Sequence, residues 1–162
     1  MTVHGHRGGW VIFFTFVAAM ILLMIPLPDW SRLLWPEWVV MVLIYWCMAL
    51  PERVGVGVGW FAGLMVDVAQ GTLLGQHALA MALVAFLTIK LHQRIRVFPL
   101  GQQALTVLLL AMIYSVIMLW IRGLTGHAPT IWSHLAPTLT TALFWPGLFL
   151  LMRFVRRRYQ VS

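Results

Sequence analysis

Few residues of this chain could do chemistry, and one of them stands in a strongly apolar stretch. Asp67 is flanked by Gly63-Leu64-Met65-Val66 and by Val68-Ala69, in a chain that has only four acidic residues. A carboxylate in such surroundings either binds a proton or a cation, or accepts hydrogen bonds that tie two elements together. Gln70, Gln76 and His77 follow closely and could line a polar pocket with Asp67.

The sequence after Asp67 favours the structural role. The chain turns at residues 70–72, and a new helix is expected to begin around Leu74 or Gly75. The free N–H groups at the start of that helix could donate to the Asp67 carboxylate, and the helix dipole favours an anion there. His77 could pair with Asp67 across the turn. A proton- or cation-coupling site stays the alternative, because Glu37 could approach Asp67 in space.

Other reactive side chains do not form a constellation that indicates an enzyme. Cys47 is the only cysteine and lies in an apolar run, and Ser115 has no base beside it in sequence. His127 and His134 lack the spacing of a metal site. The sequence therefore predicts a non-enzymatic protein with no metal and no cofactor.

The elements that position these residues are membrane helices. Of the 162 residues, 62% are hydrophobic and 9% are charged, and the mean hydropathy is +0.91. A soluble domain would need far more polar surface. The net charge of +7 does not indicate nucleic-acid binding, because the basic residues lie between and after apolar runs.

The apolar runs predict an all-α integral membrane protein with six transmembrane helices in one bundle. A helix crosses the hydrocarbon with roughly 17–25 residues. The chain is expected to form a single membrane domain over residues 1–162, with the first apolar segment retained. The expected spans are residues 10–25, 37–50, 54–68, 73–91, 104–121 and 131–152, with a basic loop after the fourth span and a basic tail over 153–162.

The distribution of basic residues predicts the orientation. With the N-terminus inside, nine of the 11 Lys and Arg residues fall in inner segments, and only Arg32 and Arg122 fall in outer loops. This bias places both termini in the cytoplasm. Tryptophans near the span ends are expected to be interfacial anchors: Trp10, Trp30, Trp35, Trp38, Trp120 and Trp132.

Glycines recur every four residues through the third expected span. Gly55, Gly59 and Gly63 stand in the same register as Asp67, and Gly71 and Gly75 continue it. Residues four apart share a helix face, so the row predicts a groove that lets another helix approach closely. The sequence leaves open whether that helix belongs to this chain or to a partner. Pro36 precedes the second span and suits the first helical turn.

These motifs, in this order, resemble the bacterial rod-shape-determining MreD family. The resemblance rests on Gly63-x-x-x-Asp67-x-x-x-Gly71-x-x-x-Gly75, on Trp35-Pro36-Glu37-Trp38, on the corner over residues 49–57, and on the closing stretch over residues 145–153. It covers essentially the whole chain. It implies a bundle similar to the substrate-binding subunits of energy-coupling-factor transporters. It also implies an inner-membrane protein that acts with MreC and, directly or through MreC, with MreB, RodA and its transpeptidase.

Two functions follow as expectations. The first is a non-enzymatic scaffold that regulates rod cell shape and lateral peptidoglycan synthesis, in contact with membrane lipid. Asp67, Gly71 and Gly75, the glycine row and Pro36 would then be a structural or partner-binding motif. The alternative is a membrane transport subunit that binds a small molecule between its helices from the outside.

Overall fold

The computed structural model describes residues 9–26, 28, 34–52, 54–71, 74–124, 126 and 132–159, and the side chains of 132–134 are outside the description. These residues form six helices: α1 (Gly9–Met24), α3 (Trp38–Ala49), α4 (Val56–Gln70), α5 (Gln76–Val97), α6 (Leu100–Leu124) and α7 (Trp132–Arg158). The part of the chain covered by these ranges contains no strand. The all-helical expectation is confirmed for these residues.

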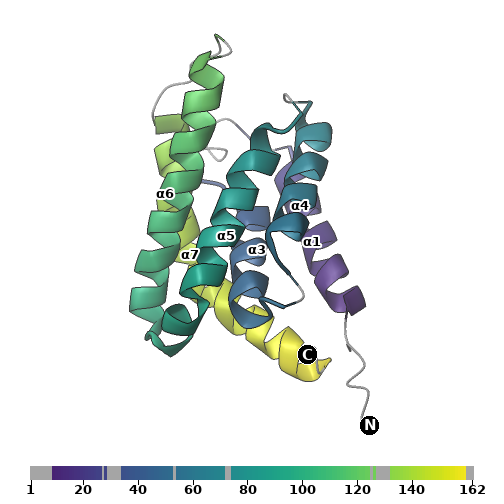
Figure 1. Ribbon diagram of the computed structural model, residues 1–162, viewed down its shortest axis with the longest axis vertical. Helices are drawn as coiled ribbons and strands as arrows, with labels where there is room; N and C mark the ends of the chain where they lie inside the picture. The colour runs from purple at the N-terminus through teal and green to yellow at the C-terminus, as the bar shows by residue number, and fades with distance from the viewer. Residues whose placement is uncertain are drawn as a thin grey trace.

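The helices form one up-and-down bundle around α3 (Figure 1). Every residue of α3 from Val39 to Ala49 is buried. A helix that is apolar on all sides must be buried to be stable in a compact fold. Helices α1, α5 and α7 pack around it, and α4 packs mainly on α5. Helix α3 is therefore the core of the protein, and the other helices surround it.

Three helices of the described residues, α5, α6 and α7, are long and apolar enough to cross a membrane. Helices α1, α3 and α4 are apolar but shorter, with 16, 12 and 15 residues. At 1.5 Å per residue, α3 is about 18 Å long, which is less than the roughly 30 Å of a bilayer's hydrocarbon.

The helices extend further at their basic ends than the sequence suggested. Residues 92–97, expected as a basic loop, continue α5 as far as Val97. The Arg96 side chain donates to the carbonyl oxygens of Met48 at 2.8 Å and Ala49 at 2.6 Å. It thereby satisfies carbonyl groups at the end of α3, where a cation also complements the helix dipole. The expected tail is likewise helical up to Arg158.

The start of α1 and the end of α7 lie at the same end of the bundle (Figure 1). Helix α7 runs obliquely and brings Tyr159 against Trp10, with ring centroids 5.1 Å apart. The basic last turns of α5 and α7 lie at this end as well. The opposite end is formed where α1, α4 and α6 finish and where α3, α5 and α7 begin.

Candidate functional site: a polar pocket over the central helix

A cavity of about 510 Å³ opens at the end of the bundle away from the start of α1 and the end of α7. It is lined by Leu23, Met24, Ile25, Pro26, Trp35, Pro36, Glu37, Val39, Val40, Val66, Gln70, His77, Met81, Tyr114, Met118, Arg122 and Pro137. Because α3 starts only at Trp38, its first turn forms the floor of this cavity. Sites for small molecules are commonly about 300–1,000 Å³, so the cavity has a suitable size.

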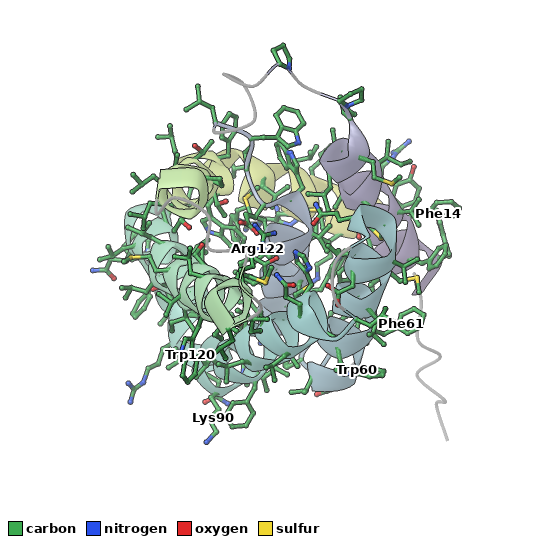
Figure 2. The ribbon with its side chains drawn as sticks, turned by 90° about the horizontal axis from the view of Figure 1, so that it is seen from above. Phe14, Trp60, Phe61, Lys90, Trp120 and Arg122 are labelled. Atoms are coloured by element: carbon green, nitrogen blue, oxygen red, sulfur yellow. The ribbon has the colours of Figure 1, made fainter. Side chains whose placement is uncertain are left out.

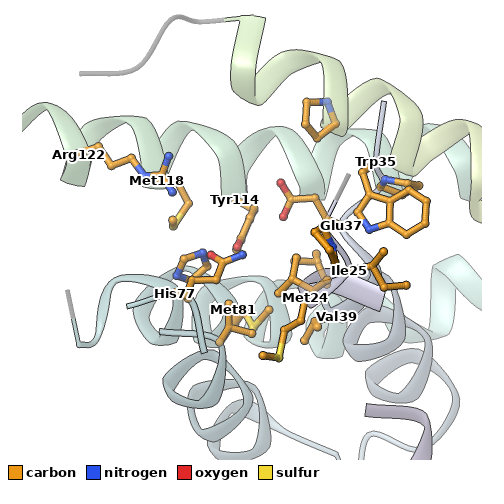
Figure 3. Close-up of a pocket in the computed structure, with 17 residues that line it drawn as sticks. Met24, Ile25, Trp35, Glu37, Val39, His77, Met81, Tyr114, Met118 and Arg122 are labelled. Carbon is orange, nitrogen blue, oxygen red and sulfur yellow. The ribbon is translucent and has the colours of Figure 1, made fainter. Parts of the chain in front are cut away.

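One wall of the cavity carries charged and polar side chains from two helices, α5 and α6, and from the entry to α3. Glu37, Tyr114, His77 and Arg122 are gathered around the same space (Figure 3). Tyr114 and Arg122 are the side chains whose polar groups act on the Glu37 carboxyl group. From above, Arg122 lies near the middle of the bundle (Figure 2). The cavity therefore holds a carboxyl group and a guanidinium group.

Backbone contacts hold Glu37 in place. Its N–H donates to the Thr141 hydroxyl at 3.0 Å. That hydroxyl donates in turn to the carbonyl of Pro137 at 2.7 Å, within α7. Trp35, two residues earlier, donates its indole N–H to the carbonyl of Leu22 at 2.7 Å. The segment that carries Glu37 is thus fixed to α1 on one side and to α7 on the other.

Asp67 lies behind the pocket wall and organises the start of α5. The side chain is fully buried. The N–H groups of Gly75 and His77 donate to its two carboxylate oxygens at 2.9 and 3.0 Å, and His77 Nδ1 is 2.6 Å from Oδ1. These are the hydrogen bonds that the sequence suggested. They fix the orientation of the His77 ring, which lines the cavity.

The corner between α4 and α5 depends on two glycines with left-handed backbone. Gly71 ends α4 with φ of 67°, and Gly75 precedes α5 with φ of 97°. Residues with a Cβ rarely adopt these angles. Both glycines are therefore part of the turn rather than of the helix face, although they continue the four-residue register.

The glycine row is used inside the chain at two of its positions. A Cβ on Gly63 would come within 2.4 Å of the Ala78 Cα, and one on Gly59 within 3.0 Å of the Met81 carbonyl oxygen. Helix α5 thus packs directly against the backbone of α4. Gly55 makes only an ordinary contact, at 3.9 Å from an Ile89 side-chain carbon. The close packing predicted for the glycine row is confirmed at Gly59 and Gly63, and the helix that packs there is α5.

The residues proposed from sequence as a pocket divide into two groups. Gln70 and His77 line the cavity, whereas Asp67 and Gln76 do not. The Gln76 amide instead faces the Met118 sulfur at 3.9 Å. Pro36 is a buried lining residue, but it precedes the N-cap Glu37 rather than standing in the first helical turn. The expectation for Pro36 was wrong in this detail, because α3 begins two residues later.

Three lining residues were assigned to other roles from the sequence or were not considered. Trp35 was expected to be an interfacial anchor, and Arg122 was placed in an outer loop. The structure puts Trp35 in the cavity wall and Arg122 in the last turn of α6. Tyr114 gave no signal in its apolar run. Few charged residues were expected on the outer side, and this scarcity could have suggested that Glu37 and Arg122 lie close to one another. Trp30, Arg32 and His127 lie outside the described residues, as do the side chains of Trp132 and His134.

The comparison with protein families shows to which family the chain belongs. The family model described as rod shape-determining protein MreD matches residues 5–155. The chain belongs to the MreD family. It is also 32% identical, over 146 residues, to the rod shape-determining protein MreD of Haemophilus influenzae, with 90% of each chain covered. No solved structure matches the chain. The apolar helices fit a membrane protein, and membership of the MreD family connects the chain with rod cell shape.

Proposed function

We propose that the chain spans the bacterial inner membrane six times as a single domain, with both termini in the cytoplasm. The three shorter helices would then cross with the help of their flanking residues or by thinning the bilayer locally. The start of α1 and the basic ends of α5 and α7 lie at one end of the bundle, which supports this orientation. The pocket would accordingly face the periplasm.

The function that we propose is a non-enzymatic scaffold of the elongation complex. The chain would act with MreC, and directly or through MreC with MreB, RodA and its transpeptidase, to control lateral peptidoglycan synthesis. The observation that carries this proposal is the family match over residues 5–155. The basic cytoplasmic ends of the helices would rest on anionic lipid, which contributes about 1 kcal/mol per basic residue near the surface.

The packing of α4 restricts where a partner helix would bind. Gly59 and Gly63 already hold α5, so the proposed partner would not use that part of the glycine row. Asp67, Gly71 and Gly75 shape the α4–α5 corner at the outer end of the bundle. We assign them the role of presenting this corner, with Pro36 and Glu37 beside it, to the partner.

Depletion and complementation test the scaffold. Rod-shaped cells depleted of the protein should become round, and a plasmid copy should restore rods. The tagged protein, solubilised in mild detergent, should co-purify with MreC. Cells that keep their rod shape and width after full depletion would contradict the proposal.

A second candidate function is a small-molecule-binding subunit of a transporter, in a fold similar to the substrate-binding subunits of energy-coupling-factor transporters. The observation that favours it is the pocket of about 510 Å³ with polar groups from several helices. Purified protein that retains a ligand in a one-to-one ratio, fails to bind MreC and supports uptake of that ligand would favour transport over the scaffold.

A further inference from the structure

The pocket has two chemically different sides. His77, Tyr114 and Arg122 stand on one side, and Trp35, Met24 and Ile25 stand on the other, with Glu37 between them (Figure 3). A ligand that fills the space must therefore present polar groups on one side and apolar surface on the other. Water alone could form hydrogen bonds on the polar side but would leave the apolar side without a suitable contact.

The charges select the polar part of the ligand. Arg122 presents a guanidinium, which suits a phosphate or a carboxylate, and Glu37 presents a carboxylate, which suits an ammonium group. A purely anionic ligand would meet Glu37, and a purely cationic ligand would meet Arg122. A molecule with both charges complements the two residues together.

The apolar side continues onto the outer surface of the bundle. Met24 and Ile25 line the cavity and are 60% and 40% exposed. Met24 is the last residue of α1, an outer helix of the bundle (Figure 1), and Ile25 follows it directly. An acyl chain attached to a headgroup in the cavity could leave over these two side chains and join the surrounding lipid.

We propose that the pocket binds a zwitterion made of a primary ammonium and a phosphate or carboxylate. Arg122 would bind the anionic group, and Glu37 would accept hydrogen bonds from the ammonium. This chemistry belongs both to the headgroup of phosphatidylethanolamine and to small free zwitterions such as phosphoethanolamine. The inference concerns binding alone and does not depend on the scaffold role.

Native mass spectrometry of the full chain from mild detergent tests the proposal and separates the two sources. The probes are phosphatidylethanolamine, phosphatidylcholine, phosphatidylglycerol and free phosphoethanolamine, each added to delipidated protein. A headgroup site predicts one phosphatidylethanolamine per chain. Phosphatidylcholine should bind more weakly, because its quaternary ammonium cannot donate to Glu37. Binding of phosphoethanolamine without the lipid would identify a free zwitterion as the ligand.

Substitutions connect the binding to the pocket. Glu37→Gln and Arg122→Gln each remove one charge-assisted hydrogen-bonding group and should weaken binding roughly ten- to a hundredfold. Arg94→Gln, at the exposed opposite end of α5, is the matched control and should bind as the unchanged protein does. A maleimide dye on the buried Cys47 checks that each variant is folded.

Two results would overturn the proposal. One is equal retention of the zwitterion by the folded Glu37→Gln and Arg122→Gln variants. The other is a preference for phosphatidylglycerol, which has no ammonium group. The scaffold would be tested separately, by the ability of the same variants to restore rod shape in depleted cells and to co-purify with MreC.

Discussion

Adding one methyl group at Gly63 should force the two most closely packed helices apart. In the Gly63→Ala protein, the new Cβ would lie 2.4 Å from the Ala78 Cα and 2.5 Å from the Ala78 nitrogen. Both are backbone atoms, so no side chain can rotate out of the way. Ordinary contact begins at 3.4 Å. The backbone of α5 must therefore move by about 1 Å relative to α4.

The expected cost follows from overpacking. Extra methyl groups in a well-packed interior destabilise by about 1–3 kcal/mol. Alanine recovers up to about 1 kcal/mol of helix propensity relative to glycine. For a chain of this size, 1 kcal/mol corresponds to about 2–4 °C in Tm. We expect Gly63→Ala to lower Tm by up to about 12 °C, and by about 2–12 °C relative to a Gly→Ala change that gains the same helix propensity without a clash.

The chain contains its own reporter for this measurement. Cys47 is the only cysteine and is fully buried in α3, so a maleimide dye in detergent reports the temperature at which the bundle opens. Gly57→Ala is the control, because a Cβ there meets nothing within 4 Å. It should leave Tm unchanged or raise it. Gly59→Ala, with contacts at 3.0 Å, should fall between the two. Equal Tm values for Gly57→Ala and Gly63→Ala would refute the packing argument.

Two further predictions concern polar contacts. Asp67→Asn should be milder than Asp67→Leu, because the amide oxygen can still accept one of the two backbone N–H groups that Asp67 holds; a buried N–H left without a partner costs about 1–3 kcal/mol. Equal and complete loss of stability in both, measured by the same dye assay, would indicate that the charge itself is needed. Arg96→Met should lower Tm by removing both donors to the last carbonyls of α3, and Arg96→Lys should restore part of the loss. The exposed Arg94→Met is the control; a Tm as low as that of Arg96→Met would show that the basic charge at this end matters more than the hydrogen bonds.

The features that local chemistry determines could be predicted from the sequence. The hydrogen bonds of Asp67 involve residues only eight to ten positions away, so a turn and a helix start were sufficient to anticipate them. The close approach at Gly59 and Gly63 followed from their four-residue spacing. The identity of the helix in the groove did not follow, because any helix can pack on glycine. Only the fold shows that it is α5.

The pocket could not be predicted, because its members come together only through the topology. Glu37 and Tyr114 are 77 positions apart in sequence and meet because α3 begins where the middle of α6 passes. Arg122 was assigned to an outer loop because it follows an apolar run. Such a position predicts the side of the membrane but not the direction in which the side chain points. The length of α3 was also decisive. Its first turn at Trp38 leaves room above it, and a longer helix would have filled that space.

The burial of α3 has a consequence for biosynthesis. Its neighbours α5 and α7 are synthesised after it, so its final surroundings do not exist when the ribosome releases it. In the meantime its uncharged sequence can be solvated by lipid, and Trp46 can already donate to the Thr15 hydroxyl of α1, at 2.9 Å. Tyr45 must wait for Phe149 of α7, whose ring centroid lies 5.8 Å away. Assembly of the central helix is therefore completed only when the last helix of the chain arrives.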